Sequence, residues 1–506
     1  MDQIETSKPR PEDPTAAGSV SSSNAGSVRR TKIVATLGPA SSTPEMIRQL
    51  IAAGVDVFRL NFSHGSADEK ARLIDVIRSE ADRADRFIPI IADIQGPKIR
   101  IGEVEGIITL VPNDEVVITT RKIVGTRELL STPFAALPTE VKRGHRILIN
   151  DGLVELIVTE IIDGEQVKTR VVHGGAVSSK KGMNFPDTEL SIPAITEKDR
   201  EDLRFAVEHG VDYVAASFIR KREDIEDLRR LLQSLGGEEI AVIAKLEKAQ
   251  AIDALESILE VSDGVMVARG DLGVELPPEI VPIMQKRILS LASYWGRFAI
   301  TATQMLESMT TNSRPTRAEA SDVANAIFDG SDAVMLSAET ASGMYPIEAV
   351  EMMSRIVVAA EQNPQLHVQP ERDPFHQSYE ADEFTDALAG ATNYAAEQIK
   401  ARYIVVFTLT GFAARLMSKF RPDAPIVALT SKTGVARRMS ILWGVIPFVL
   451  TDVGEYHEQI VERVERYLID KEMVVKGDRI VILMGSPIYK RAQTNLLRVH
   501  RVGGGR

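Results

Sequence analysis

From Lys32 onward, short apolar runs rich in Val and Ile alternate with amphipathic stretches of helical period. This alternation predicts parallel β-strands joined by helices, because strands buried on both faces are apolar throughout while the covering helices carry one apolar stripe. The first predicted helix has residues at both ends that are typical of helix starts and stops. Ser42 is its expected N-cap, with Glu45 three residues later, Pro44 lies in its first turn, and Gly54 ends it.

Eight such strands are predicted in the first two-thirds of the chain. Two of them belong to a repeated local unit, GVDVFRLNFS and GVDYVAASFI, each preceded by an apolar-striped helix. Eight buried parallel strands with intervening helices predict a (β/α)8 barrel of the TIM type, and an open doubly wound sheet is the alternative. The predicted strands are 32–37, 55–60, 88–93, 212–217, 241–246, 264–268, 298–302 and 332–337.

Two further regions are predicted, one inserted into the barrel and one that follows it. Residues 98–185 alternate apolar and polar positions with period two between Asp-Gly and Gly-Gly turns, which predicts an inserted antiparallel β-barrel domain that can act as a lid. Beyond a linker rich in Pro and His, the βα pattern resumes as a C-terminal α/β domain. The expected divisions are a disordered tail at 1–28, a barrel at 29–97 and 186–363, a lid at 98–185, and a C-terminal regulatory or assembly domain at 364–506.

Composition narrows the class of function. A chain of 506 residues is long enough for about three domains, in agreement with the pattern. The net charge of −11 disfavours broad nucleic-acid or anionic-membrane binding, and the absence of cysteine excludes disulfides, thiolate nucleophiles and Cys–zinc sites. No apolar run reaches the length that spans a bilayer. A cytoplasmic enzyme or binding protein is expected.

Charged residues follow the predicted barrel strands, at the end where barrel enzymes place their chemistry. Phosphoryl transfer requires a positioned cationic clamp, which Arg59 and Lys245 can provide. Glu247 and Asp271 supply the hard oxygen ligands that Mg²⁺ prefers. Each feature alone has a structural explanation, such as a solvated strand end or a turn. Their conjunction indicates a metal-assisted barrel enzyme that acts on a phosphate or an enolate.

Several long, ordered motifs make the chain resemble the pyruvate kinases from about residue 29 to the C-terminus. The family converts phosphoenolpyruvate and ADP to pyruvate and ATP in the last step of glycolysis, and its members are typically homotetramers. The motifs are TKIVATLGPAS (31–41), FRLNFSHG (58–65), DIQGPKIRIG (93–102), AVIAKLEKAQAI (241–252), GVMVARGDLGVELP (264–277), ATQMLESM (302–309) and RPTRAEASDVANAIFDGSDAVMLSAETASGMYP (314–346).

The resemblance implies a role for each matching residue at the phosphoryl group and the metal. Arg59 would bind the transferring phosphoryl group, and Lys245 would stabilise its transition state. Glu247 and Asp271 would hold the divalent metal, Mg²⁺ or Mn²⁺.

The resemblance also implies contacts to the rest of the substrates. The backbone around Gly270 and Asp271, with Thr303, would receive the substrate carboxylate, and Thr303 would also lie near the enolate carbon. The nucleotide would contact Asn61, Phe62, Ser63, His64, Arg100 and Lys181.

The monovalent-cation region departs from the family pattern. Asn61, Ser63, Asp93 and the carbonyl of Ile94 match the potassium site, but Lys98 stands where potassium-dependent members carry Glu. Its ammonium can replace the potassium charge and is expected to pair with this region, so potassium is expected not to be required. The alternative is that Lys98 points into solvent beside a working potassium site.

The C-terminal domain resembles the family least. Its first loop reads TLTGFAARL (408–416), with Leu409, Phe412 and Ala413 where phosphate donors would help, while Lys490 and Arg491 lie in a later loop. An anionic effector, a sugar monophosphate or a nucleotide, is one expectation for this domain. A purely structural domain that supports tetramer assembly is the other.

Two other functions stay open at this stage. A Mg²⁺-dependent barrel lyase or aldolase that works through pyruvate enolate would use the same Lys, Glu and Asp but would need no nucleotide lid. A non-catalytic paralogue that senses metabolites is the second, and the intact Lys245, Glu247, Asp271 and Thr303 argue against it.

Overall fold

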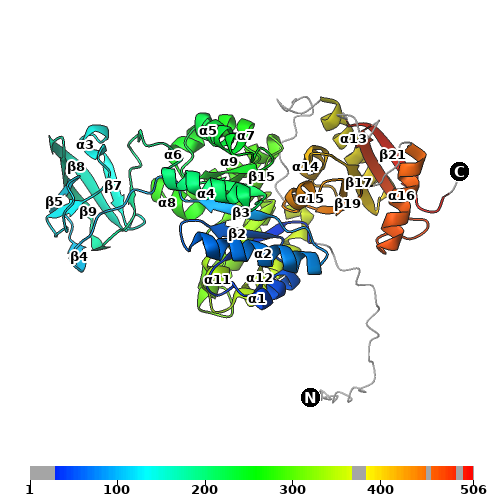
Figure 1. Ribbon diagram of the computed structural model, residues 1–506, viewed down its shortest axis with the longest axis horizontal. Coiled ribbons are helices and arrows are strands. Elements are labelled where there is room, and N and C mark those ends of the chain that lie inside the picture. The colour runs from blue at the N-terminus through cyan, green and yellow to red at the C-terminus, as the bar shows by residue number, and fades with distance from the viewer. Residues whose placement is uncertain (1–28, 367–382, 452–456, 486–493, 505–506) are drawn as a thin grey trace, which may run out of the picture.

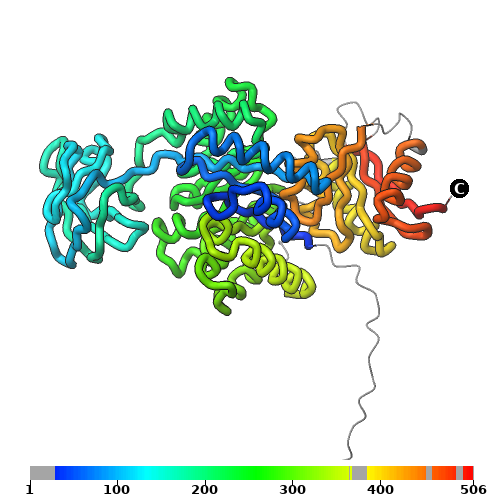
Figure 2. The backbone as a smooth tube through the Cα atoms, turned by 60° about the horizontal axis from the view of Figure 1, so that its bottom comes forward, coloured from blue at the N-terminus to red at the C-terminus, as the bar shows by residue number. Residues whose placement is uncertain are grey.

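The computed structural model describes residues 29–366, 383–451, 457–485 and 494–504. The predicted disordered tail at 1–28 lies outside the described residues, as does most of the linker that follows the barrel. Three bodies lie in a row, with the inserted domain at one end, the barrel in the middle and the C-terminal domain at the other end (Figures 1 and 2). No helix among the described residues is long and apolar enough to cross a membrane.

The central body is a closed barrel of eight parallel strands, which confirms the predicted fold class. The largest shift from the predicted boundaries is two residues, at Val57 and Ile90. Neighbours around the barrel follow the order β1-β16-β15-β14-β13-β12-β3-β2. These strands are β1 (Lys32–Leu37), β2 (Val57–Asn61), β3 (Ile90–Ile94), β12 (Tyr213–Ala216), β13 (Ala241–Leu246), β14 (Gly264–Ala268), β15 (Phe298–Ala302) and β16 (Ala333–Leu336).

Helices cover the outside of the barrel, and a continuous apolar core lies between them and the strands. A second core fills the barrel interior and includes Val34, Ile91, Ile243 and Met266. The covering helices are α1 (Pro44–Ala53), α2 (Ala67–Arg83), α4 (Glu197–Glu208), α5 (Arg222–Ser234), α6 (Ala249–Asp253), α7 (Leu255–Val261), α8 (Arg269–Glu275), α9 (Val281–Tyr294), α10 (Arg317–Phe328), α11 (Ala338–Ala341) and α12 (Pro346–Glu361).

The start of α1 corrects one prediction. The N-cap is Thr43 rather than Ser42, and the Thr43 hydroxyl accepts a hydrogen bond from the backbone amide of Met46 at 3.2 Å. The physical reason is Pro44, because a residue before proline is pushed out of the helical region into the extended conformation that an N-cap adopts. Gly54 ends the helix with φ of 114°, as predicted.

The inserted segment forms two sheets around a core of its own. A six-stranded sheet has the order β11-β7-β8-β9-β5-β6, and β10 pairs with β4 in a second sheet. The pairing is antiparallel except between β5 and β6, which are parallel. The elements are β4 (Ile107–Leu110), β5 (Glu115–Thr119), β6 (Leu129–Ser131), α3 (Leu137–Glu140), β7 (Arg146–Ile149), β8 (Val154–Asp163), β9 (Gln166–His173), β10 (Gly175–Ser178) and β11 (Met183–Asn184).

The C-terminal body is a five-stranded sheet of order β19-β18-β17-β20-β21, parallel except for its last pair. Its strands are β17 (Tyr403–Phe407), β18 (Ile426–Thr430), β19 (Val445–Val449), β20 (Arg479–Gly485) and β21 (Thr494–Arg501). Its helices are α13 (Glu383–Ile399), α14 (Phe412–Lys419), α15 (Thr433–Met439) and α16 (His457–Asp470).

The C-terminal body packs against the amino ends of the barrel strands. At the start of β1, Lys32 Nζ donates to the carbonyl of Val445 at 2.8 Å. At the start of β12, Tyr213 Oη donates to the carbonyl of Arg438 at 2.6 Å. Because this end of the barrel is covered, the carboxyl ends of the strands are left to face the inserted domain.

Candidate active site

The predicted site residues meet at the carboxyl ends of the barrel strands. Arg59 and Asp93 lie on the neighbouring strands β2 and β3, and Lys245 lies near the end of β13. The remaining groups follow their strands, with Glu247 just after β13, Gly270 and Asp271 in α8 directly after β14, and Thr303 just after β15.

A buried ionic cluster forms the centre of this group. Arg59 Nε lies 2.6 Å from Asp93 Oδ2, and Lys245 Nζ lies 3.2 Å from Asp93 Oδ1. Lys245 Nζ also lies 2.7 Å from Glu247 Oε1 and donates to Ser217 Oγ at 2.7 Å. Asp93 and Glu247 are each only 2% exposed, so the cluster is shielded from water.

Mutual attraction keeps Lys245 and Asp93 charged. Burial by itself would lower the pKa of the Lys245 ammonium, but Asp93 and Glu247 outweigh burial and raise that pKa. Burial likewise favours the neutral form of Asp93, yet Arg59 and Lys245 hold its pKa below the usual range. The site therefore presents a fixed ammonium and a fixed guanidinium, which suits an anionic substrate.

Glu247 and Asp271 form the acidic part of the site. Burial raises the pKa of Glu247 against the opposing effect of Lys245, and the nearby negative charge of Asp271 adds to the rise. Two neighbouring carboxylates supply the hard oxygen ligands that a divalent cation prefers. No group of three or more His, Asp or Glu side chains suitable for a metal occurs in the described part of the chain.

Thr303 and Gly270 form the next part of the rim. Thr303 Oγ1 accepts from the Gly270 amide at 2.8 Å and donates to the carbonyl of Ala302 at 2.7 Å. Thr303 and Gln304 both have left-handed backbone, with φ of 63° and 54°. Strained backbone of this kind persists where the surroundings hold it, and it often marks functional sites.

Arg269 holds this strained segment, a role that sequence reasoning did not assign. Its guanidinium donates to the carbonyls of Thr303 at 2.7 Å and Gln304 at 3.3 Å, and it pairs with Asp322 of α10 at 2.8 Å. The Arg269 side chain therefore faces the outer wall rather than the substrate position. The only sequence signal was its place beside Gly270.

The loop after β2 contains the predicted nucleotide residues. The Asn61 side chain accepts from the Ser63 amide at 3.0 Å, which fixes the turn. Two lysines that were not predicted fasten the loop from helices. Lys70 of α2 donates to the carbonyl of His64 at 2.6 Å, and Lys198 of α4 donates to that of Phe62 at 2.9 Å.

The remaining predicted residues lie where the inserted domain joins the barrel. Arg100 donates to the carbonyl of Lys180 at 3.0 Å and forms an isolated bridge with Gly182, so the outgoing and returning connections run side by side. The Ile101 amide donates to the carbonyl of Lys181 at 2.9 Å.

The expected pairing of Lys98 with the cation region is not present among the contacts of the described residues. Lys98 is exposed, and its stem lies beside Gly182. Both Asp93 carboxylate oxygens are already engaged, by Arg59 and Lys245. A buried carboxylate that two cations already neutralise offers little attraction to a third.

Comparisons with known proteins agree over both parts of the chain. The family model for the pyruvate kinase barrel domain matches residues 28–350, and the model for the pyruvate kinase alpha/beta domain matches residues 386–500. The pyruvate kinase of Sporosarcina psychrophila is 41% identical over 482 residues, which are 94% of this chain and 81% of that protein.

Further relatives give the same result. The pyruvate kinase of Geobacillus stearothermophilus is 42% identical over 93% of this chain and 80% of its own length. A solved structure of a pyruvate kinase from Cryptosporidium parvum is similar with a TM-score of 0.85 and 35% identity, covering 94% of this chain and 96% of that one. The chain belongs to the pyruvate kinase family, and it is a glycolytic phosphotransferase that transfers a phosphoryl group from phosphoenolpyruvate to ADP.

Proposed function

We propose that the buried ionic cluster is the phosphoryl-transfer centre of this pyruvate kinase. The observation that carries the proposal is the placement of Lys245 between Asp93 and Glu247, with Arg59 on the other side of Asp93. Arg59 binds the phosphoryl group, and Lys245 stabilises the charge that develops during transfer. Because both cations are already oriented and shielded, little reorganisation accompanies the reaction.

We propose Mg²⁺, or Mn²⁺ in its place, as the divalent ion, with Glu247 and Asp271 as its protein ligands. When bound, the ion supplies positive charge that neutralises and orients the substrate oxygens. Lys245 contacts Glu247 Oε1, and the Phe218 amide donates to Glu247 Oε2 at 2.9 Å. These contacts orient the carboxylate before any ion arrives.

We further propose that Thr303 and the backbone around Gly270 and Asp271 receive the substrate carboxylate. The Gly270 amide donates to Thr303 Oγ1, so the two groups are held together at the start of α8. The Thr303 hydroxyl lies in this proposal near the enolate carbon, where it assists proton delivery through water. For that role, the Thr303 hydroxyl must break its hydrogen bond to the carbonyl of Ala302 and donate to the water instead.

The nucleotide is proposed to lie between the β2 loop and the inserted domain. Asn61, Phe62, Ser63 and His64 contribute from the loop, which Lys70 and Lys198 hold in place. Arg100 and Lys181 contribute from the two connections of the inserted domain. That domain acts as a lid, which excludes the water that would otherwise accept the phosphoryl group.

Potassium is proposed not to be required. Arg59 and Lys245 already neutralise Asp93, and Lys98 adds a further positive charge at the lid connection. The neutralised Asp93 carboxylate therefore offers little net negative charge to a monovalent cation.

The C-terminal domain is proposed to bind an anionic effector, a sugar monophosphate or a nucleotide. The hydroxyls of Thr408 and Thr410 accept from the amides of Gly411 and Phe412 at the start of α14, and each hydroxyl can still donate its own hydrogen to an anion. Lys490 and Arg491 lie outside the described residues.

We propose a homotetramer in the cytoplasm, with the domain limits expected from the sequence: 29–97 with 186–363, 98–185, and 364–506. Support for assembly comes from apolar side chains on the C-terminal body. Phe384 and Tyr394 of α13 are 68% and 65% exposed, and Val499 of the edge strand β21 is 52% exposed.

The first prediction concerns Lys245. Lys245→Met is expected to lower kcat by at least 10²–10³-fold, roughly the loss for one preorganised transition-state donor, with a much smaller change in KM for phosphoenolpyruvate. Steady-state measurement of pyruvate and ATP formation checks this. A loss of turnover below tenfold would remove Lys245 from the proposed role.

The second prediction concerns the metal. Glu247→Gln is expected to raise the Mg²⁺ concentration that gives half-maximal rate, because a neutral amide is a poorer ligand for a hard cation. Asp271→Asn is expected to act in the same direction. Direct Mn²⁺ binding, followed by electron paramagnetic resonance, gives a readout independent of turnover. Parent-like metal titrations in both variants would place the ligands elsewhere.

The third prediction concerns Lys98. The parent enzyme is expected to keep its full rate in potassium-free, sodium-free buffer with tetramethylammonium as counterion, and Lys98→Glu is expected to acquire a potassium requirement. A tenfold or greater increase in the parent rate on adding potassium would show that a working potassium site exists beside Lys98.

A further inference from the structure

The loop between β12 and α5, residues 217–221, touches the proposed catalytic groups on one side. Ser217 Oγ accepts from Lys245 Nζ at 2.7 Å and donates to the carbonyl of Ile94 at 2.8 Å. The next amide, that of Phe218, donates to Glu247 Oε2 at 2.9 Å. Two consecutive residues therefore fix the positions of Lys245 and Glu247.

Phe218 has an unfavourable backbone conformation. Its φ is 58°, in the left-handed region that bulky residues rarely adopt. Gly96 packs so closely that a Cβ there would lie 2.9 Å from the Phe218 ring. Strain of this kind is maintained only by surrounding contacts, and it identifies the loop as a segment whose shape matters for function.

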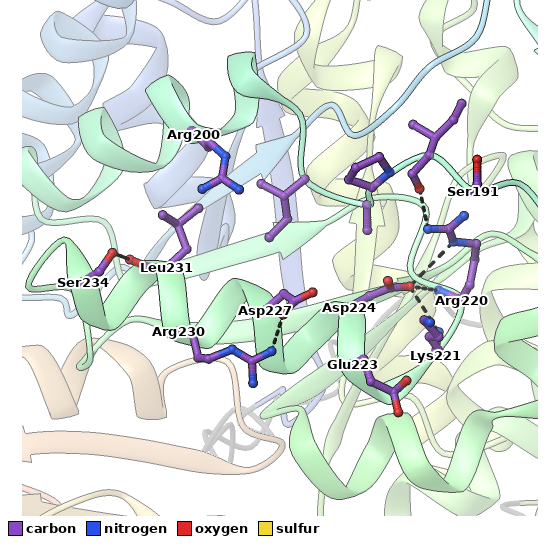
Figure 3. A pocket seen from close by; sticks show the side chains of 14 residues that line it. Ser191, Arg200, Arg220, Lys221, Glu223, Asp224, Asp227, Arg230, Leu231 and Ser234 are labelled. Carbon is purple, nitrogen blue, oxygen red and sulfur yellow. Dashed lines mark hydrogen bonds and ion pairs between the residues drawn. The ribbon is translucent and has the colours of Figure 1, made fainter. Parts of the chain in front are cut away.

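On its other side, the loop 217–221 is hydrogen-bonded to the connection that returns from the inserted domain to the barrel. The Arg220 guanidinium donates to the carbonyls of Leu190 at 2.5 Å and Ile192 at 2.7 Å. Asp224 of α5 holds Arg220 in place, since its carboxylate accepts from the Arg220 amide at 2.9 Å. Figure 3 shows Arg220, Asp224 and Lys221 gathered beside Ser191. The planar fork of an arginine suits this double contact.

A cavity of about 580 Å³ lies behind this connection, lined by Ser191, Ile192 and Pro193 on one side and by α5 on the other (Figure 3). Open space therefore borders the connection at 191–193, while Ala194 already belongs to the core between the barrel and its helices. The two hydrogen bonds from Arg220 attach the connection to the loop at this point.

A second set of contacts joins the lid to the same loop. Asn184 of β11 donates to Glu275 Oε1 at 2.9 Å, and Lys248 Nζ lies 2.5 Å from the same oxygen. The Lys248 ammonium also lies 5.4 Å from the centre of the Phe218 ring. Glu275 belongs to α8, the helix that carries Asp271, and Lys248 follows Glu247 directly.

We propose that Arg220 is a positioning residue that couples closure of the lid to the placement of Lys245 and Glu247. The loop 217–221 transmits the position of the lid connection at 190–192 to Ser217 and Phe218, which hold the two groups. Arg220 itself contacts no reacting atom. The inference rests on the phosphoryl-transfer centre proposed above.

The test compares Arg220→Met and Arg220→Lys with the matched control Arg230→Met, a change at an exposed residue that lines the same cavity and pairs with Asp227. Arg220→Met is expected to lower kcat by about 10–100-fold, since small misplacements of catalytic groups have effects of this size. Arg220→Lys is expected to lie between the parent and Arg220→Met, because a lysine can serve one carbonyl at a time. Arg230→Met is expected to behave like the parent.

The amount of pyruvate formed per ATP provides a second readout. Because it is a ratio of two products, it does not change when part of the enzyme is unfolded. In Arg220→Met the loosened lid admits water, which attacks the phosphoryl group of phosphoenolpyruvate. The P–O bond to the enol oxygen breaks, inorganic phosphate forms, and the enolate takes up a proton to give pyruvate without ATP. The ratio of pyruvate to ATP is therefore expected to rise above one.

Turnover within threefold of the parent in Arg220→Met would overturn the proposal, as would lower turnover with the ratio still at one. If Arg220→Met does not fold, the same two criteria apply to Arg220→Lys. If the Lys245→Met variant, with Arg220 unchanged, keeps its activity, the proposed phosphoryl-transfer centre is refuted instead. The two failures are therefore distinguishable.

Discussion

Burial strongly disfavours a charged ammonium unless an opposite charge lies beside it, and this constraint organises the proposed active site. Lys245 is 11% exposed, and without partners its burial would favour the neutral amine. Asp93 and Glu247 reverse that preference, and Arg59 in turn keeps Asp93 ionised. The four groups therefore depend on one another, and each must be held by the barrel strands at hydrogen-bonding distance.

The wider fold provides these positions. The neighbouring parallel strands β2 and β3 bring Arg59 and Asp93 together, with Asp93 two residues beyond the register partner of Arg59, and β13 carries Lys245 from the other side of β12. The C-terminal body covers the amino ends of the strands, through contacts such as Lys32 with Val445. The carboxyl ends face the inserted domain, so that domain and the ionic cluster lie on the same side of the barrel.

Much of this arrangement could be predicted from the sequence, because the carboxyl ends of all the strands of a parallel barrel lie at the same rim. The eight strands, the inserted domain and the residues of the ionic cluster follow from the apolar pattern and the motifs. The individual contacts could not be predicted in this way. Lys70, Lys198, Arg220 and Arg269 act by donating to backbone carbonyls, and a sequence does not show which carbonyls are turned toward them.

The pairing of Lys98 shows a second limit. Its expected attraction to the cation region depended on free negative charge at Asp93, but that charge is already shared between Arg59 and Lys245. Competition among several cations for one carboxylate is decided by distances and burial, which sequence spacing does not supply.

The dependence of Lys245 on Asp93 is tested most directly by the pH profile of kcat in Asp93→Asn and in the parent enzyme. Loss of the Asp93 charge removes the largest influence that raises the pKa of Lys245, so that pKa falls even though Glu247 still opposes the effect of burial. The account predicts that turnover of the variant falls with rising pH at a distinctly lower pH than turnover of the parent. Alkaline limbs that coincide in the two enzymes would contradict it.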